Sequence, residues 1–362
     1  MSREDAALRE AFASKRALVT GAFGFLGSHT ARRLAEYGAR VTALDIRARA
    51  SRPCLLNDPS LRLRSRLDVE PVDMTSSASV REVVRRGRFD FVFHFAAYAT
   101  VIEKAMAEPF QTVEANTMAC VNLLEALRLC RRRPEAVLLA STDKVYGDAG
   151  GAAYDEERTP LRGIGVYDSA KLAADLFART YHEAYGLPTI VLRMCNIFGP
   201  YDFNTRYRLV PKTLEGLYGP GPLRAPSLYR DSARHRRDYL YVDDAVRAFL
   251  LLAREPRCRG DVFNLRPCRN VSTPGMLRSL HAAAVRVERS LDPSRARAIA
   301  RHGVRLQDRK GDACLVTIAR QHLRSRKLVE ATGFRPEVGF EDALERTVRF
   351  YRGWYLGRRR VR

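Results

Sequence analysis

The residues best suited to chemistry are a tyrosine and a lysine four positions apart, Tyr167 and Lys171. Residues at i and i+4 lie on one face of a helix, so both side chains can reach the same site. A tyrosine hydroxyl has an ordinary pKa of about 10 and is a poor base unless nearby positive charge favours its phenolate. The Lys171 ammonium can supply that charge. The pair therefore predicts proton removal from a ligand hydroxyl, although an isolated spacing of this kind is common by chance.

A polar run, Ser141-Thr142-Asp143-Lys144, precedes this pair and directly follows an apolar segment at 136–140. Thr142 is placed to hold a ligand hydroxyl in line with the tyrosine. Asp143 and Lys144 have the side chains of an acid and a base, and such a pair can move two protons in one reaction. Lys144 works as a base only if it loses its proton near neutral pH. The alternative is that it binds a phosphate or hydroxyl of the ligand.

A glycine-rich segment near the N-terminus reads Thr20-Gly21-Ala22-Phe23-Gly24-Phe25-Leu26-Gly27. Glycines permit a tight turn and let a pyrophosphate approach the backbone amides at a helix N-terminus, but such a turn alone is a weak signal. Asp45 ends the next expected strand about 20 residues later, where a carboxylate accepts hydrogen bonds from ribose hydroxyls. This predicts NAD rather than NADP, because an acid repels a 2′-phosphate. Arg47 and Arg49 follow closely and favour the opposite choice.

Short apolar segments alternate with amphipathic ones along the first half of the chain. Such alternation is typical of a parallel, doubly wound sheet whose strands are buried on both faces. We therefore predict an α/β, Rossmann-type fold. Residues 1–195 form the expected NAD-binding domain, and residues 196–362 mainly form a smaller C-terminal α/β substrate lobe, with some segments returning to the Rossmann sheet. The expected strands are 17–20, 41–45, 89–94, 136–140 and 189–193, and the expected helices include 25–37, 113–130 and 169–185.

The chain of 362 residues is 46% hydrophobic, so it can bury a large core, and it carries a formal net charge of +22. An excess of basic over acidic residues can indicate nucleic-acid binding. Here, however, arginines are spread over the whole chain, and no helix-turn-helix, zinc-finger or RNA-binding signature accompanies them. We expect no nucleic-acid partner. The charge would instead raise the local concentration of an anionic ligand such as a nucleoside diphosphate.

Neither a membrane span nor a metal site is expected from the sequence. No stretch of about 18 uncharged apolar residues occurs, and the first residues lack the order of a signal peptide, so we predict a cytoplasmic protein without a membrane partner. Seven scattered cysteines contain no Cys-x-x-Cys pair that would indicate zinc. We interpret them as free, inert thiols. A catalytic Cys195, beside the expected site, is the remote alternative.

Together these motifs resemble the extended short-chain dehydrogenase/reductase family, in its NAD-dependent nucleotide-sugar epimerase/dehydratase branch. The likeness extends over nearly everything from about residue 15 to residue 355. It is specific for the family and less so for the reaction. The segments that carry it are 20–27, 94–97, 116, 122–126, 141–147, 167–171, 193–200, 237–245, 332–336 and 340–344.

The resemblance implies a set of site residues. Asn196 and Arg237 match positions that hold the diphosphate of the substrate, and an arginine suits bidentate phosphate contacts. The implied catalytic residues are Thr142, Asp143, Lys144, Tyr167 and Lys171. The implied NAD-binding residues are Gly21, Phe23, Gly24, Phe25, Leu26, Gly27, Asp45, Asp73, Met74, Phe95, Ala96, Ala97 and Asn116, together with Tyr167 and Lys171.

The resemblance also implies a transient oxidation of a nucleotide-diphosphate sugar. Tyr167 takes the proton of the sugar C4 hydroxyl while hydride passes to NAD, and the resulting ketone acidifies the C5 hydrogen. In 4,6-dehydratases of the family an acid–base pair follows the catalytic threonine. Asp143 would then protonate the departing C6 hydroxyl and Lys144 would remove the C5 proton. We therefore expect an NAD-dependent nucleotide-sugar 4,6-dehydratase.

Many such dehydratases carry Glu where this chain has Lys144. The Asp-Lys version looks more like CDP-glucose 4,6-dehydratases and C5-inverting UDP-N-acetylglucosamine dehydratases. Residues 203–206 resemble an Asp-Leu-Asn-Trp stretch of the CDP-glucose branch, but no tryptophan is present there. The nucleotide base therefore stays open.

Two other functions remain open. A C4-epimerase would use the same ketone but needs no acid–base pair, and epimerases of the family usually have small residues at positions 143 and 144. A non-catalytic NAD-binding sensor or scaffold is the more remote alternative, because it would need none of Thr142, Tyr167 and Lys171. The family also implies a homodimer, formed through two paired helices around 108–129 and 169–185.

Overall fold

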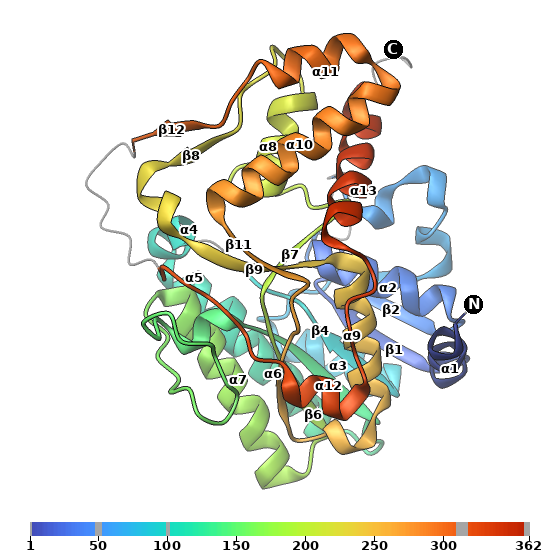
Figure 1. Ribbon diagram of the computed structural model, residues 1–362. Coiled ribbons are helices and arrows are strands. Elements are labelled where there is room, and N and C mark those ends of the chain that lie inside the picture. The colour runs from blue at the N-terminus through green and yellow to red at the C-terminus, as the bar shows by residue number, and fades with distance from the viewer. Residues whose placement is uncertain (1, 48–52, 99–101, 309–317, 358–362) are drawn as a thin grey trace.

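The computed structural model describes residues 2–47, 53–98, 102–308 and 318–357. Within these ranges a parallel sheet of seven strands forms the centre of the lower half of the molecule (Figure 1). Its spatial order is β10-β6-β5-β4-β1-β2-β3, so the chain extends the sheet outward on both sides of β1 and β4. The strands are β1 (Arg16–Thr20), β2 (Arg40–Leu44), β3 (Asp68–Glu70), β4 (Phe91–His94), β5 (Ala136–Thr142), β6 (Thr189–Met194) and β10 (Val262–Asn264).

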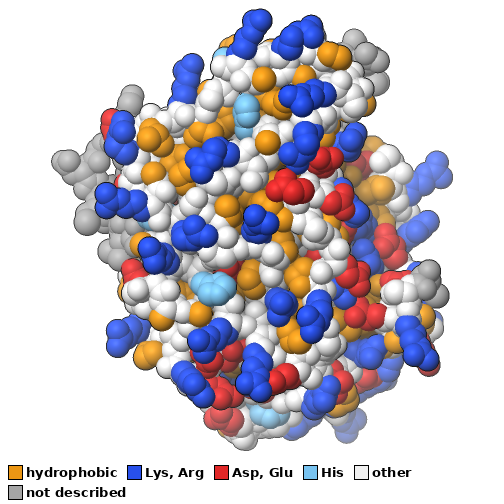
Figure 2. All heavy atoms as spheres, in the orientation of Figure 1, with side chains coloured by type: hydrophobic (Ala, Val, Ile, Leu, Met, Phe, Trp, Pro, Cys, Tyr) orange, Lys and Arg blue, Asp and Glu red, His pale blue; other side chains and the backbone are white. Residues whose placement is uncertain are grey.

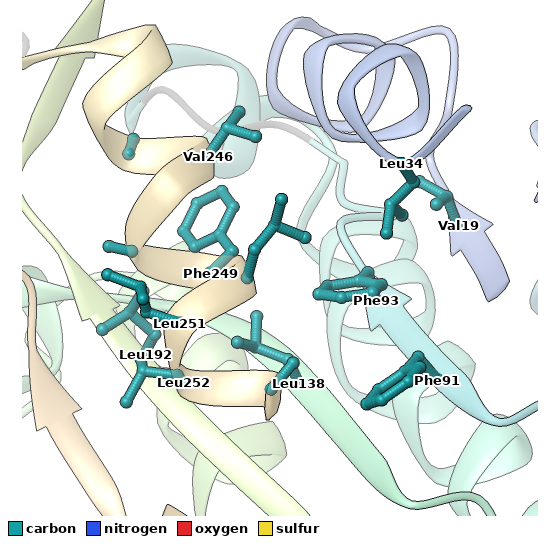
Figure 3. Packing of buried hydrophobic residues seen from close by; sticks show 14 of the residues in the cluster. Val19, Leu34, Phe91, Phe93, Leu138, Leu192, Val246, Phe249, Leu251 and Leu252 are labelled. Carbon is teal, nitrogen blue, oxygen red and sulfur yellow. The ribbon is translucent and has the colours of Figure 1, made fainter. Parts of the chain in front are cut away.

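Helices cover both faces of this sheet because successive strand residues are apolar on both sides. Val19 and Phe93 contribute to one buried cluster with α1, α2 and α9, and Figure 3 shows them together with Leu34 of α2 and Phe249 of α9. Leu18 and Val92 contribute to the other cluster with α3, α6 and α7. The predicted doubly wound α/β fold is therefore confirmed. The helices are α1 (Arg3–Phe12), α2 (Phe25–Glu36), α3 (Ser77–Gly87), α6 (Ala119–Arg128), α7 (Val166–Tyr185) and α9 (Val242–Arg254).

The expected helix at 113–130 is not one regular helix. It consists of the end of α5 (Pro109–Val113), a π-helical turn at Glu114–Met118, and α6, and α4 (Ile102–Ala107) precedes it. The buried Asn116 lies in the π turn, where its Nδ2 donates to the carbonyl oxygens of Thr112 at 2.7 Å and Tyr98 at 2.8 Å. A side chain that bonds to the backbone of the preceding turn competes with the regular helical ladder.

A second, smaller group of elements forms the upper half of Figure 1. Its helices surround a third buried cluster that includes Leu214, Leu280 and Leu344. Two small sheets, of order β11-β9-β7 and β12-β8, border this cluster. The elements are β7 (Asn196–Phe198), α8 (Leu209–Tyr218), β8 (Ser227–Tyr229), β9 (Arg236–Tyr241), β11 (Arg269–Ser272), α10 (Thr273–Leu291), α11 (Pro293–Ala300), β12 (Arg305–Gln307) and α13 (Phe340–Arg352).

Segments late in the chain join the two halves. The strand β10 lies in the large sheet, and α9 and α12 (Arg326–Thr332) lie beside it. Residues 318–323, which precede α12 in the chain, cross from the smaller half to the larger one. They form isolated β-bridges at Arg236–Arg320 and Tyr154–Leu323. The buried Asp238 of β9 fixes this crossing by accepting the Leu323 N–H at 2.6 Å. The division of the chain at residue 195 stays a prediction.

Basic side chains are scattered over the face that Figure 2 shows rather than gathered in one patch. Figure 2 shows Lys and Arg side chains interspersed with Asp and Glu over the face that it presents. In the described part of the chain, no helix is both long and apolar enough to cross a bilayer.

Candidate active site

The candidate site residues meet at the carboxyl edge of the large sheet. Gly21 follows β1, Asp45 follows β2, Phe95 follows β4, and Thr142 ends β5. Because all these strands are parallel, their carboxyl ends lie along one edge, which is where ligands bind in open α/β sheets. The segments that the sequence predicted to bind cofactor and to carry the catalytic side chains are therefore brought together.

The glycine-rich turn between β1 and α2 has no room for side chains. Gly21 adopts φ +66°, and a Cβ there would lie 2.7 Å from the Ala96 nitrogen. A Cβ on Gly27 would lie 2.2 Å from the Gly21 oxygen. Gly24 precedes α2 as its N-cap residue and has no side chain to cap it, so the first amides of the helix remain available to an anion. This cradle fits the pyrophosphate of a dinucleotide.

The loop after β4 is held against this cradle by Thr20. The Phe95 N–H donates to the Thr20 carbonyl oxygen at 3.1 Å, and the Ala96 N–H donates to Thr20 Oγ1 at 3.3 Å. The next residue, Ala97, is exposed. Asn116 holds the same loop from the other side, because its Oδ1 accepts the Tyr98 N–H at 3.2 Å. Its amide therefore contributes to the site by fixing the loop.

Asp45 lies buried at the end of β2, where it would meet the adenosine ribose. Its carboxylate accepts the Phe23 N–H at 3.0 Å, and it also forms an ion pair with Arg47 Nε at 3.2 Å. The structure thus pairs Asp45 with Arg47. In the sequence, the aspartate favoured NAD and the arginine favoured NADP. Arg49 lies outside the described residues.

The remaining predicted cofactor residues lie in the turn after β3 and in the first turn of α2. Asp73 is exposed in a turn after β3 and accepts the Thr75 N–H at 2.9 Å, whereas Met74 is buried. Phe25 and Leu26 are half-buried in the first turn of α2. The cofactor role of these residues stays a prediction.

The catalytic run Thr142–Lys144 forms the tight turn that follows β5. Thr142 Oγ1 accepts the Lys144 N–H at 3.3 Å, so the threonine caps the 3₁₀ turn at Asp143–Tyr146. Gly147 ends the turn with φ +66°, and a Cβ there would lie 2.3 Å from the Arg162 oxygen. The turn is thereby held in one conformation, with the Asp143 and Lys144 side chains at the edge of the sheet.

Asp143 is a buried carboxyl with an incomplete set of partners. Its Oδ1 accepts a hydrogen bond from Thr142 Oγ1 at 3.3 Å, but its Oδ2 is buried without a hydrogen-bond partner among the described residues. Burial raises the pKa of Asp143 to about 7, although the positive charges of Lys144 and Arg237 oppose that rise. A carboxyl with such a pKa can donate a proton near neutral pH.

Tyr167 and Lys171 lie in the first two turns of α7, as the sequence predicted. Lys144 Nζ lies 5.5 Å from the centre of the Tyr167 ring, which joins the two catalytic segments. Burial raises the pKa of Tyr167, and the charge of Arg208 lowers it. Burial lowers the pKa of Lys171, and the negative charge of Asp175 opposes this effect.

A buried polar network, which we call the support cluster, lies beneath the catalytic turn. Arg193 is 1% exposed and its Nε donates to Asp175 Oδ2 at 2.9 Å, while Ser141 Oγ donates to the same oxygen at 3.0 Å. Arg193 Nη1 also donates to the Tyr146 hydroxyl at 2.9 Å. The support cluster consists of Ser141, Tyr146, Asp175, Arg193 and Asn264.

The two predicted substrate residues lie on neighbouring strands of the smaller half. Asn196 of β7 is exposed, and its Nδ2 donates to the Asp238 carbonyl oxygen at 3.3 Å. Arg237 of β9 donates to the carbonyl oxygens of Ala319 at 3.0 Å and Ile318 at 2.6 Å. Burial lowers the pKa of Arg237, and the negative charge of Asp143 opposes this effect.

Two charged residues near the site were missed from the sequence. Arg208, just before α8, forms an ion pair with Asp202 at 3.1 Å and acts on Tyr167. Asp168 directly follows Tyr167 and is 3% exposed. The position of Asp168 inside the Tyr-x-x-x-Lys spacing was the available signal. For Arg208, the only signal in the sequence was its position close to residues 203–206. Cys195 is buried, and burial raises its pKa, which leaves a thiol unreactive.

Comparisons with known proteins agree with this geometry. Residues 17–265 match the family model described as the NAD dependent epimerase/dehydratase family. The chain belongs to this family. It is also 31% identical over 352 residues to a dTDP-glucose 4,6-dehydratase of Streptomyces niveus, with 93% of each chain covered.

Members with a different reaction are similar to a comparable degree. The UDP-glucuronate 4-epimerase 5 of Arabidopsis thaliana is 28% identical, with 94% of this chain and 76% of that protein covered. Among solved structures, a double mutant of dTDP-glucose 4,6-dehydratase from Streptomyces venezuelae with NAD bound superposes with a TM-score of 0.77 at 28% identity. That superposition covers 94% of this chain and 99% of the other. The protein is therefore an enzyme of the epimerase/dehydratase family, and the predicted family and enzyme class are confirmed.

Proposed function

We propose that the protein is an NAD-dependent nucleotide-sugar 4,6-dehydratase. The observation that carries this proposal is the pair Asp143 and Lys144 beside Tyr167. Asp143 has a pKa of about 7, and Lys144 Nζ lies over the Tyr167 ring. An epimerase needs only the tyrosine and the lysine of α7, whereas removal of water needs an additional acid and base.

Each side chain has a distinct task in this proposal. Tyr167 takes the proton of the sugar C4 hydroxyl, and Thr142 holds that hydroxyl. Lys144 takes the C5 proton once C4 is a ketone. Asp143 gives its proton to the C6 hydroxyl, which leaves as water. The pKa of Asp143 supports its role as the acid, because about half of it is protonated at pH 7.

NAD would be held by the glycine cradle and by Asp45. The absence of side-chain space at Gly21 and Gly27 supports pyrophosphate binding, and the buried Asp45 supports ribose binding. When bound, the nicotinamide accepts a hydride from C4 and supplies it to C6. Lys171, which is 6% exposed, would bind the nicotinamide ribose and place positive charge near Tyr167.

Asn196 and Arg237 would hold the diphosphate of the substrate. The charge interaction between Arg237 and Asp143 supports this, because it brings the diphosphate residue close to the catalytic turn. The relatives that are named after dTDP-glucose make this sugar nucleotide the first substrate to try. CDP-glucose is the second, because of the Asp143-Lys144 pair.

The test uses the purified protein with NAD and the CDP-, UDP-, GDP- and dTDP-glucoses. We expect one of them to lose one water, detected by mass, and to yield a 4-keto sugar, detected by its absorbance in alkali. Lys144→Ala and Asp143→Ala should remove the water loss. Lys15→Ala, a lysine paired with Glu135 outside the site, is the matched control and should retain it. An unchanged mass with a new stereoisomer would establish an epimerase instead.

We further infer that the protein is a homodimer. Large apolar side chains are exposed together on α5, the π turn and α7, which are the helices expected to pair. Phe110 is 73% exposed, which is unusual for a phenylalanine on a free surface. The others are Val113, Met118, Leu176 and Phe177. Phe110→Glu should convert a dimer to a monomer in sedimentation analysis, and a wild-type monomer would contradict the inference.

A further inference from the structure

Asp45, the carboxylate expected at the adenosine ribose, already has a full set of hydrogen-bond donors within the chain. Its Oδ2 accepts the Phe23 N–H at 3.0 Å, and its Oδ1 accepts the backbone N–H of Arg47 at 2.9 Å. The Arg47 side chain supplies the other donors, Nε to Oδ1 at 3.2 Å and Nη2 to Oδ2 at 3.5 Å. A carboxylate has about four acceptor positions, so none is left for a ribose hydroxyl while Arg47 stays in place.

Arg47 covers Asp45 on the side that faces solvent. The Asp45 side chain is 3% exposed, whereas the Arg47 side chain is 47% exposed. The backbone fixes the turn that brings them together, because Asp45 Oδ1 accepts the N–H of the second residue after it, an arrangement common in turns. A dinucleotide that reaches Asp45 from solvent must therefore contact or displace the Arg47 guanidinium.

The guanidinium also lies next to the glycine cradle. Its Nη2 is 4.0 Å from the place that a Cβ on Gly24 would take, and Gly24 is the N-cap residue of α2. Arg47 thus lies between the end of β2 and the start of α2. The adenosine ribose and the pyrophosphate of a dinucleotide bind at these two places.

Arg47 keeps donors that Asp45 does not use. A guanidinium carries five N–H donors, and Asp45 takes two of them. None of the described residues accepts the others. The planar arrangement of guanidinium donors matches the oxygens of a phosphate in a two-point contact. The ion pair also offsets the negative charge of Asp45, which would otherwise repel a 2′-phosphate.

We propose that Arg47 lets the adenosine site accept a 2′-phosphate, so that the protein binds NADP about as tightly as NAD. NAD can use Asp45 only after its ribose hydroxyls displace the guanidinium, whereas NADP brings a phosphate that replaces the carboxylate as the partner of Arg47. The inference rests on the proposed function only for the placement of the dinucleotide in the glycine cradle. No bond is made or broken at this site, and the proposed steps at the sugar are unchanged.

Two substitutions should shift the preference in opposite directions. Arg47→Ala removes the partner of the phosphate and restores the full charge of Asp45, so NADP should bind about 10- to 100-fold more weakly. The same change frees Asp45 for the ribose hydroxyls, and NAD should bind at least as tightly as before. Asp45→Asn removes both the acceptor that NAD needs and the charge that repels the phosphate. It should weaken the binding of NAD and leave that of NADP unchanged or tighter.

Arg132→Ala is the matched control. Arg132 is an exposed arginine that pairs with a buried aspartate, Asp90, whose other oxygen accepts the Arg16 N–H at 2.8 Å. Asp90 directly precedes β4, at the amino edge of the sheet and away from the cradle. Loss of Arg132 thus leaves a buried carboxylate without its ion-pair partner, as loss of Arg47 does, but the binding of both dinucleotides should be unchanged.

The measurement is calorimetric titration of the purified protein with NAD and with NADP, without any sugar nucleotide. A second readout is the phosphorus NMR signal of the 2′-phosphate of bound NADP. A phosphate monoester loses its second proton at about pH 6, and a bound guanidinium favours the dianion. The midpoint of this titration should therefore move to lower pH in the wild type and in Arg132→Ala, and should stay at about pH 6 in Arg47→Ala.

The outcomes separate this inference from the proposed function. Affinities for NAD and NADP within about tenfold of each other, with only that for NADP lowered in Arg47→Ala, support the inference. If no glucose nucleotide then reacts, the dehydratase proposal fails and the inference stands.

Three results would overturn the inference. A wild type that binds NAD about 100-fold more tightly than NADP would do so and would leave the dehydratase proposal intact. Equal losses for both dinucleotides in Arg47→Ala would show that Arg47 only neutralises Asp45. Failure of both dinucleotides to bind would remove the cradle assignment on which the inference rests. If Arg47→Ala does not fold, Arg47→Gln decides by the same ratio of affinities.

Discussion

Two neighbouring groups of buried and half-buried polar side chains differ in how completely their hydrogen bonds are satisfied. In the support cluster, the described side-chain polar atoms have partners within the protein, and Arg193 alone bonds to both Asp175 and Tyr146. In what we call the catalytic cluster, Asp143, Lys144, Tyr167 and Asp168, two buried carboxylate oxygens lack a hydrogen-bond partner among the residues that the structure describes. Polar groups that stabilise a fold have their hydrogen-bond partners within the protein, whereas polar groups that act on a ligand keep atoms free to bond to that ligand.

The difference predicts opposite consequences of substitution. Loss of a partner in the support cluster leaves a charge in the protein interior without its ion-pair partner, which lowers the free energy of unfolding. Loss of a carboxylate in the catalytic cluster removes a group that was already short of partners, so stability changes little and activity falls.

The largest expected effect is on catalysis. Asp143→Asn should lower the rate of water loss by about 10²–10⁴, because an amide cannot donate the proton that the departing hydroxyl needs. The melting temperature should not fall, since a buried carboxyl with an unpaired oxygen is replaced by a neutral group of the same shape. Rates of product formation and thermal denaturation check this together. A large loss of stability would place Asp143 with the support cluster.

A nearly equal effect, on stability, is expected in the support cluster. Arg193→Met leaves the Asp175 carboxylate buried without its ion-pair partner, and we expect the free energy of unfolding to fall by about 3–5 kcal/mol. Denaturant unfolding measures this. If the variant loses activity with unchanged stability, the two clusters do not differ in the way described.

A smaller effect is expected from pH. Asp143 must be protonated to act as the acid, and its pKa is about 7, so its acid form is lost as the pH rises through 7. Above that value the rate should fall about tenfold for each pH unit, because the protonated fraction falls in proportion. The pH dependence of kcat under saturating substrate measures it. A rate that rises through pH 7 and stays high to pH 9 would exclude Asp143 as the acid.

The smallest effect is expected at an exposed ion pair. Arg326 is 88% exposed and bonds to Glu330 at 2.6 Å. Arg326→Ala should change the free energy of unfolding by less than about 0.5 kcal/mol, because water screens such pairs. This variant is the stability control for Arg193→Met. An effect as large as that of Arg193 would show that burial does not distinguish the two ion pairs.

The sequence predicted the large sheet because its strands are continuous apolar runs, and residues 136–140 and 189–193 needed no tertiary information to be recognised. The predicted cofactor and catalytic segments follow these strands, and the parallel arrangement brings the carboxyl ends of the strands to one edge. The region from 285 to 308 could not be assigned, because its many charged side chains obscure the periodicity of α10 and α11.

The support cluster could not be predicted, because its members are distant in sequence. Tyr146 and Asn264, for example, are 118 residues apart yet share a hydrogen bond of 2.8 Å. The π turn at Asn116 was hidden for a similar reason, since its cause is the contact with Tyr98. Asp168 was passed over because a carboxylate in the first turn of a helix is ordinarily explained as a cap.

The most direct test of the dehydratase proposal is one isotope experiment. A glucose nucleotide with deuterium at C4 is converted in heavy water, and the product is analysed by mass and NMR. The proposal predicts loss of one water, with the original C4 deuterium at C6 and one solvent deuterium at C5. Retention of mass, with the deuterium back at C4 and none taken up at C5, would contradict it and identify an epimerase.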